Sequence, residues 1–418
     1  MSEFALGTIK NRTQMIRFFD GYSEERVEEL DERKLKRPLV KTHLLEVLNG
    51  QCSSLSEALP SIFKRCGIEI KALDDELFLV SDLNIGEIGF LEQLTSRIIA
   101  LYSTNKSDVL YPWVRNLVFR NSDLDHVWLS GLTFGVLWEL VVKLSRPHRF
   151  TRLVFTHQSI FDIDNITIED VDEDEEPIQQ LDDDNLGEIV ERRATRFSLV
   201  DRVGVIQSKL NGLQQIYSPL YAISQLRFPS PIGRGGHDFY DNGRVTNRSE
   251  SFRDHRSHIL FVVRIYQQLL NETENKTWYS ITESIGIPGQ FHRIVGAPVV
   301  INFEQPLEKG VFDRWISATF ERKRNRFRLW GHPIRLGPTK VHVYGVDRHL
   351  WLPIFLELTA KGCTAIIPKQ TCGNTVHRLV TNIQRYLDPG AQAFIGNKSY
   401  SEIVKDSAQG VKYELDRE

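Results

Sequence analysis

A run of acidic residues in the middle of the chain places the strongest constraint on the fold. From Asp162 to Glu191 there are fourteen acidic residues and neither lysine nor arginine. Like charges repel one another and cannot be buried without partners, so this segment cannot form a core of its own. We therefore expect a solvated linker at 161–192, between an N-terminal region at 1–160 and a C-terminal region at 193–418.

Outside this run the composition is that of an ordinary folded protein. Of the 418 residues, 41% are hydrophobic and 26% are charged, which suits two or three domains. The net charge of −3 does not attract a polyanion to the whole chain, so such a partner must be argued from a local patch.

Features that the sequence lacks indicate the compartment of the protein. The four cysteines have no C-x-x-C spacing, and neither a secretory signal nor an apolar stretch of about 20 residues is present. We expect a cytoplasmic protein with no membrane partner and no metal site, and the sequence identifies no cofactor.

The region 1–160 is predicted to be mainly helical. A helix that ends at Gly50 is indicated by one apolar face, formed by Leu39, Leu44, Leu45 and Leu48. A second helix over 56–63 and a strand over 76–80 complete the order of a winged-helix-like unit, which binds DNA. Plain helical packing is the alternative.

Further along, the pattern predicts a helix that Asp123 caps and that continues to Leu140, then a strand over 150–155. Beyond the acidic run, Phe197 to Leu226 reads as a long amphipathic helix.

The end of the chain predicts a β-α-β-α unit. Strands over 341–346 and 363–367 are each followed by a helical pattern, at 348–361 and at 376–387. This order implies parallel strand pairing. The fold class is therefore α/β or α+β.

Polar residues gather where these two strands end, and open α/β sheets bind ligands at such ends. Cys372 at a helix start is a candidate nucleophile, with His349 or His377 as its base. The candidate catalytic residues are Asp347, His349, Cys372 and His377. Helix amides would bind an anion together with Arg348, Lys369, Thr371 and Asn374, although Thr371 or Asn374 can instead be a helix cap.

A glycine-rich stretch at 228–257 predicts a long polar loop of the kind that often carries function. Its glycines would let backbone amides approach an anion closely. We expect Arg234, His237 and Arg253 to contribute, whereas a loop whose polar groups bond to one another is the alternative.

Residues 253–258 read Arg-Asp-His-Arg-Ser-His, ahead of an apolar helix. This resembles the signature of HEPN-type ribonucleases, which is Arg, a polar residue, three residues and His. The resemblance implies an all-helical fold in which Arg253 and His258 handle the scissile phosphate of RNA.

A basic run with interleaved aromatic residues is the last signal. Its cations are Arg322, Lys323, Arg324, Arg326 and Arg328, and Trp315, Phe320, Phe327 and Trp330 lie around them. Between 227 and 348 there are 19 basic and 12 acidic residues. Phosphate contacts and base stacking suit single-stranded nucleic acid, whereas pairing of the arginines with the acidic linker is the alternative.

Two function classes therefore remain open. The first is a nucleic-acid-interacting protein that uses the patch at 322–330, as a component of a larger assembly with protein partners. The second is an enzyme that acts on a phosphorylated or otherwise anionic substrate near Asp347 and 371–374. A HEPN-like ribonuclease is a weaker alternative.

Overall fold

The computed structural model describes residues 6–31, 37–48, 55–163, 194–283, 292–321 and 325–414. Within these ranges the helices are α1 (Arg12–Asp31), α2 (Leu55–Lys64), α3 (Ser107–Arg120), α4 (Gly131–Leu144), α5 (Val203–Ile216), α6 (Phe252–Thr277), α7 (Lys309–Ile316), α8 (Asn374–Tyr386) and α9 (Tyr400–Ala408). Helices and antiparallel sheets are mixed, so the α/β or α+β class is confirmed. No helix in the described ranges has the length and apolarity that a membrane crossing requires.

The first sheet takes strands from both sides of the acidic run. Its order is β2-β3-β4-β5-β1-β11-β10-β9-β7-β8, and β6 pairs with β1. The strands are β1 (Lys41–Val47), β2 (Ile68–Asp74), β3 (Leu77–Asp82), β4 (Gly86–Gln93), β5 (Ile98–Ser103), β6 (Leu124–His126), β7 (Phe150–Gln158), β8 (Ala194–Arg202), β9 (Ile223–Pro229), β10 (Gly236–Tyr240) and β11 (Arg244–Asn247).

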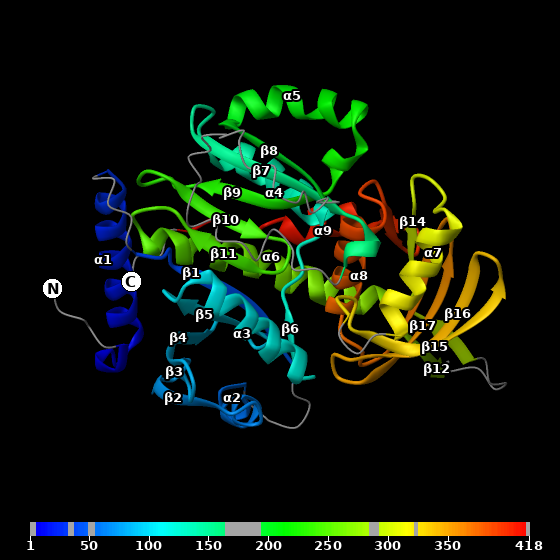
Figure 1. The fold of residues 1–418 in the computed structure, drawn as a ribbon, viewed down its shortest axis with the longest axis horizontal. Helices are drawn as coiled ribbons and strands as arrows, with labels where there is room; N and C mark the ends of the chain where they lie inside the picture. The colour runs from blue at the N-terminus through cyan, green and yellow to red at the C-terminus, as the bar shows by residue number, and fades with distance from the viewer. Residues whose placement is uncertain are drawn as a thin grey trace, which may run out of the picture.

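The second sheet has the order β15-β16-β17-β18-β14-β19-β20, and β12 joins it by parallel pairing with β18. Its members are β12 (Trp278–Glu283), β13 (His292–Val295), β14 (Val299–Asn302), β15 (Leu329–Gly337), β16 (Lys340–Asp347), β17 (Leu352–Thr359), β18 (Gly362–Pro368), β19 (Gln392–Ile395) and β20 (Lys398–Ser399). Helix α8 lies between the two sheets (Figure 1).

Both faces of the first sheet are covered around β1, which explains the unbroken burial of this strand. Leu44 packs with α1, α4 and α6 in the main core, whereas Leu45 packs with α2 and α3 in a second core. Successive side chains of a strand point to opposite faces, so a strand that is buried on both sides carries adjacent leucines. The helix predicted over 39–48 is therefore wrong, and this segment is strand β1.

The winged-helix order does not occur, because a strand precedes α2. Helix α2 and strand β3 themselves are confirmed. The helix predicted from Asp123 begins later, at Gly131, where Ser130 accepts a hydrogen bond from the Thr133 amide as the N-cap. The residues after Asp123 form β6 instead.

Two further helix predictions fail in the C-terminal half. Residues 197–226 divide into β8, α5 and β9, and residues 348–361 contain β17. In β17, Ile354, Leu356 and Leu358 are buried at every second position, which is the period of a strand. Strands β16, β17 and β18 consequently form antiparallel hairpins, and the predicted parallel β-α-β pairing is wrong. Strands β16 and β18 and helix α8 are confirmed.

The segment predicted as a loop at 228–257 contains β10, β11 and the start of α6. Because β11 pairs with β1, residues beyond the acidic run complete the sheet of the N-terminal region. The boundary predicted at 161–192 therefore does not separate two independent sheets. Residues 164–193, which include most of the acidic run, lie outside the described residues.

Gly243 turns the chain between β10 and β11 with φ of 74°, and an added Cβ would lie 2.7 Å from the Val127 carbonyl oxygen. We expect Gly243→Ala to lower the free energy of unfolding by about 1 to 3 kcal/mol. Gly135→Ala is the matched control, because Gly135 lies inside α4 with open space around it. That change should raise stability by roughly 0.5 to 1 kcal/mol. Urea unfolding measures both, and equal effects would contradict the role of the turn.

Candidate functional site

A buried group of ion pairs surrounds the first turns of α8. The Arg378 guanidinium contacts Asp125 of β6 and lies 2.6 Å from Asp347 of β16, and all three side chains are fully buried. Arg328 adds a second cation 3.1 Å from Asp125. Burial alone would raise the pKa of Asp125, yet Arg378 and Arg328 more than offset this and hold it well below its usual range.

Asp347 was predicted as a catalytic acid or base, but its carboxylate is fully engaged. It accepts hydrogen bonds from the Thr375 hydroxyl, from the Arg378 guanidinium and from the His349 amide. A carboxylate held this way positions the turn that carries His349 and the start of α8. We therefore assign Asp347 a positioning role.

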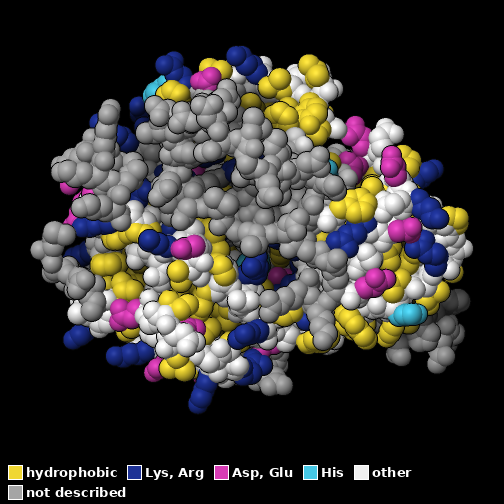
Figure 2. All heavy atoms as spheres, viewed as in Figure 1, with side chains coloured by type: hydrophobic (Ala, Val, Ile, Leu, Met, Phe, Trp, Pro, Cys, Tyr) yellow, Lys and Arg dark blue, Asp and Glu magenta, His cyan; other side chains and the backbone are white. Residues whose placement is uncertain are grey.

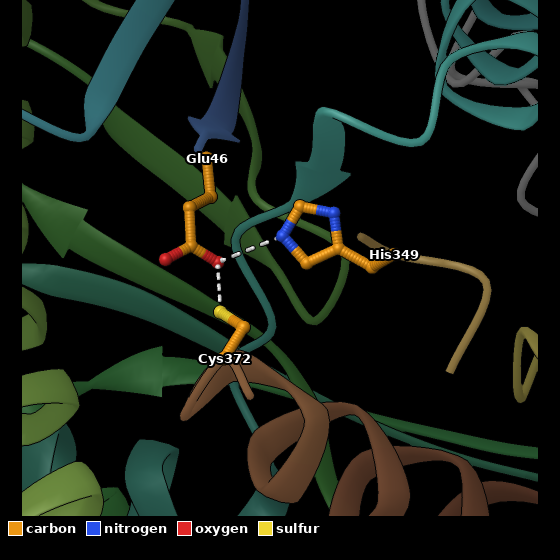
Figure 3. Close-up of side chains that lie close together, drawn as sticks. All are labelled: Glu46, His349 and Cys372. Carbon is orange, nitrogen blue, oxygen red and sulfur yellow. Dashed lines mark hydrogen bonds and ion pairs between the residues drawn. The ribbon is translucent and has the colours of Figure 1, made fainter. Parts of the chain in front are cut away.

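His349 and Cys372, which were predicted to share a site, do lie together, and Glu46 of β1 joins them (Figure 3). The Cys372 thiol is 3.1 Å from Glu46 Oε2, and His349 Nε2 is 3.9 Å from the same oxygen. All three side chains are buried. Burial and the negative charge of Glu46 raise the pKa of Cys372, so the thiol is protonated at neutral pH and a free nucleophilic thiolate is not supported.

Arg97 and Glu274 complete this cluster. Arg97 donates to Glu46 Oε1 at 2.6 Å and to Glu274 at 2.8 Å, and one of its nitrogens lies 3.4 Å from the Cys372 sulfur. Glu274 also accepts the Gly373 amide at the start of α8. Sequence reasoning missed Glu46, Arg97 and Glu274. The only available signal was an acid at position 46 inside an apolar run.

The turns around the cluster are strained. In the described part of the chain, the non-glycine residues with positive φ are Arg328, Leu350, Trp351 and Gln370. Leu350 and Trp351 follow His349, and Gln370 precedes Cys372. Such conformations cost roughly 1 to 3 kcal/mol each and persist where the surrounding structure imposes them.

The remaining residues of the predicted strand-end site have other partners. His377 faces the Tyr400 hydroxyl at 2.6 Å through Nδ1, and Asn374 donates to the His126 carbonyl. The N-cap of α8 is Gly373, and no side chain caps it, so neither Thr371 nor Asn374 is the cap. The Thr371 hydroxyl is buried without a hydrogen-bond partner.

The two cations predicted to bind an anion there do not enter the cluster. The Arg348 guanidinium lies 4.8 Å from the Phe119 ring centroid and 5.8 Å from that of Trp351. Lys369 is exposed. The predicted anion site at the strand ends is thus divided between a buried cluster and the surface.

The histidines of the glycine-rich stretch form a separate cluster. His237 Nε2 lies 2.9 Å from Asp254, and His258 Nδ1 lies 3.2 Å from the other oxygen of that carboxylate. The Tyr413 hydroxyl donates to the same carboxylate at 2.6 Å. His237 is therefore a buried partner of Asp254, whereas Arg234 is exposed.

The HEPN-like residues lie in the first turns of α6, next to β10 and β11. Arg253 is partly exposed and lies 3.8 Å from Asp20, whereas His258 is buried. A helical position agrees with the resemblance, but the mixed fold differs from the all-helical family. The ribonuclease assignment stays a prediction.

The described arginines of the basic run differ in burial. Arg322, Lys323 and Arg324 lie outside the described residues. Arg328 is buried and donates to the Leu124 carbonyl as well as to Asp125, so the prediction that it contacts a nucleic acid is wrong. Arg326 is half-buried, with its guanidinium 5.9 Å from the Tyr386 ring centroid.

The aromatic residues of the run also differ in burial. The core contains Trp315, Phe320 and Phe327, whereas Trp330 on β15 is 60% exposed. Tyr344 on β16 and Phe355 on β17 are 65% and 38% exposed, and their ring centroids are 5.0 Å apart. These three rings define an aromatic sheet face. Alternation along 340–347 was the signal that could have found Tyr344.

Comparison with known proteins identifies the family of this chain. The MJECL33-like protein family matches residues 4–403. The chain belongs to this family. It is 24% identical to the uncharacterized protein MJECL33 of Methanocaldococcus jannaschii, over 96% of this chain and 97% of the relative. No solved structure matches.

The buried ion pairs predict a large effect of removing Arg378. We expect Arg378→Ala to lower the free energy of unfolding by about 3 to 5 kcal/mol, because Asp125 and Asp347 lose their shared cation. Arg335→Ala is the control, since its ion pair with Asp313 is about half exposed and should contribute no more than about 1 kcal/mol. Urea unfolding at pH 7 compares them, and similar losses would contradict the assignment.

Buried His377 should make the stability of the folded chain fall in acid. Burial, reinforced by the positive charge of Arg97, lowers the pKa of His377 to about 3. The unfolded chain binds a proton at this histidine below about pH 6.5 and the folded chain does not. Between these values stability should therefore fall as the pH falls, by about 1.4 kcal/mol per pH unit. His377→Gln should flatten the pH dependence of unfolding by this amount between pH 6 and 4, and parallel curves would contradict it.

Proposed function

We propose that the protein binds single-stranded nucleic acid on the aromatic sheet face formed by Trp330, Tyr344 and Phe355. The observation that carries the proposal is that these three large rings are exposed together on an open antiparallel sheet. Apolar rings exposed as a group on a surface mark interaction sites. Aromatic rings on a sheet are a common platform for unpaired bases, because every base offers a flat face for stacking.

The strand register places the rings in a compact array. His332 pairs with Tyr344, and Tyr344 pairs with Phe355. The side chains of His332, Tyr344 and Phe355 therefore form a row across β15, β16 and β17. Trp330 lies two residues from His332 on the same face of β15. Neighbouring strands are about 4.8 Å apart. A chain of bases crossing the strands can thus meet successive rings.

Cations lie beside the rings and can meet phosphates. Lys340 and His342 share one carboxylate, that of Glu357, at 2.8 Å and 2.7 Å. A hollow of about 310 Å³ borders β15, and its lining includes His332, which lies on the same face of that strand as Trp330. In Figure 2, apolar side chains are interspersed with basic ones over the part of the molecule that carries the second sheet.

The test is loss of binding on removal of a ring. We expect Tyr344→Ala and Trp330→Ala each to weaken binding of a short fluorescent oligothymidine or oligouridine roughly 5- to 150-fold, which corresponds to about 1 to 3 kcal/mol per stacked base. Tyr344→Phe keeps the ring and should bind nearly as the wild type does. Phe150→Ala is the matched control, because Phe150 is 61% exposed on the first sheet. Fluorescence anisotropy measures the affinities.

Salt dependence separates phosphate contact from stacking. Lys340→Ala should reduce the slope of log K against log salt by up to about 0.7, since one phosphate contact on a single strand is lost. Lys405→Ala removes a similarly exposed, paired lysine from α9 and should leave the slope unchanged. Equal affinities of the Tyr344→Ala, Trp330→Ala and Phe150→Ala variants, or no binding by the wild type at low salt, would refute the proposal.

A further inference from the structure

We propose that Glu46, His349 and Cys372 bind one Zn²⁺ ion and leave a fourth coordination position open. This site is separate from the aromatic sheet face and does not depend on nucleic-acid binding. The three ligands come from β1, from the turn after β16 and from the turn before α8, so only the folded chain brings them together.

The ligand atoms have the spacing that a zinc ion requires. Glu46 Oε2 lies 3.1 Å from Cys372 Sγ and 3.9 Å from His349 Nε2, and the three atoms all lie within 4.8 Å of one another. Tetrahedral zinc with bonds of about 2.0 to 2.3 Å holds its ligand atoms roughly 3.3 to 3.8 Å apart. Small side-chain movements therefore complete the geometry.

The tautomer of His349 is the one a metal ligand needs. Its Nδ1 lies 2.7 Å from the Ser122 carbonyl oxygen, which can only accept, so Nδ1 carries the proton. The lone pair of Nε2 then points toward Glu46 and Cys372, and this buried atom has no hydrogen-bond partner. Metal-binding histidines commonly donate their other ring N–H to a carbonyl or carboxylate in this way.

The carboxylate is oriented as well. Arg97 occupies Glu46 Oε1 and leaves Oε2 facing the sulfur and the imidazole. The ion pairs of Glu46 and Glu274 both go to Arg97, so two buried carboxylates share one cation. A divalent ion with a Cys372 thiolate would cancel the remaining negative charge, and binding would release the thiol proton to solvent.

The ligand types select the metal. A thiolate with an imidazole and a carboxylate suits zinc, whereas magnesium and calcium prefer oxygen ligands alone. Structural zinc sites usually have four protein ligands. Three protein ligands are typical of catalytic zinc, where water or substrate takes the fourth position.

Cobalt binding to the full chain tests the site. After removal of metal with a chelator, we expect one equivalent of Co²⁺ to give a thiolate-to-cobalt charge-transfer band that Zn²⁺ abolishes. Cys372→Ser should lose the band. Cys66→Ser, which changes a cysteine that bonds to Asn121, should keep it. Azide should shift the visible spectrum of the cobalt protein if the fourth position is open.

A second variant tests the site even if Cys372→Ser does not fold. His349→Gln should weaken Co²⁺ binding more than about 100-fold, since loss of an outer partner alone weakens metal sites 10- to 100-fold. Thermal melting verifies that each variant is folded. Failure of the wild type to bind Co²⁺, a band that persists in Cys372→Ser, or a band lost in Cys66→Ser would overturn the site. An azide-insensitive spectrum would overturn the open position.

Discussion

The contact of Arg378 with two carboxylates is the interaction on which the arrangement of the two sheets depends. Asp125 belongs to the first sheet, Asp347 belongs to the second, and Arg378 lies on the helix between them. A buried charge is tolerated only with partners, and Arg378 of α8 is a partner of both carboxylates. The pairing therefore specifies one relative position of the three elements.

That position also assembles the proposed zinc site. Asp347 accepts the His349 amide, and the Thr375 hydroxyl links Asp347 to α8 just after Cys372. Strand β16 consequently serves both proposals. Its end carries Asp347 in the interior, while Tyr344 three residues earlier points to solvent on the aromatic sheet face. The proposed binding surface lies on β16, and one ligand of the proposed zinc site, His349, follows the end of that strand.

The periodic pattern of α8 and the alternation of β16 could be predicted from the sequence, whereas the doubly buried strand β1 could not. Helix α8 carries a continuous apolar stripe, and β16 alternates, so periodicity alone identified both. Strand β1 is buried on both faces and has no alternation to read, and its leucines mimic a helical face. The helix predicted over 348–361 is wrong because Asp347 suggested a helix cap, whereas pairing with β16 makes this segment a strand.

The sequence by itself determined that His349 and Cys372 follow β16 and β18, and that a basic, aromatic segment lies at 322–330. It could not place Glu46, which meets Cys372 across 326 residues of chain. It also could not separate buried Arg328 from half-buried Arg326, or buried Phe327 from exposed Trp330. Only the tertiary structure decided these points, because long-range sheet pairing and the burial of paired charges depend on contacts that no local pattern records.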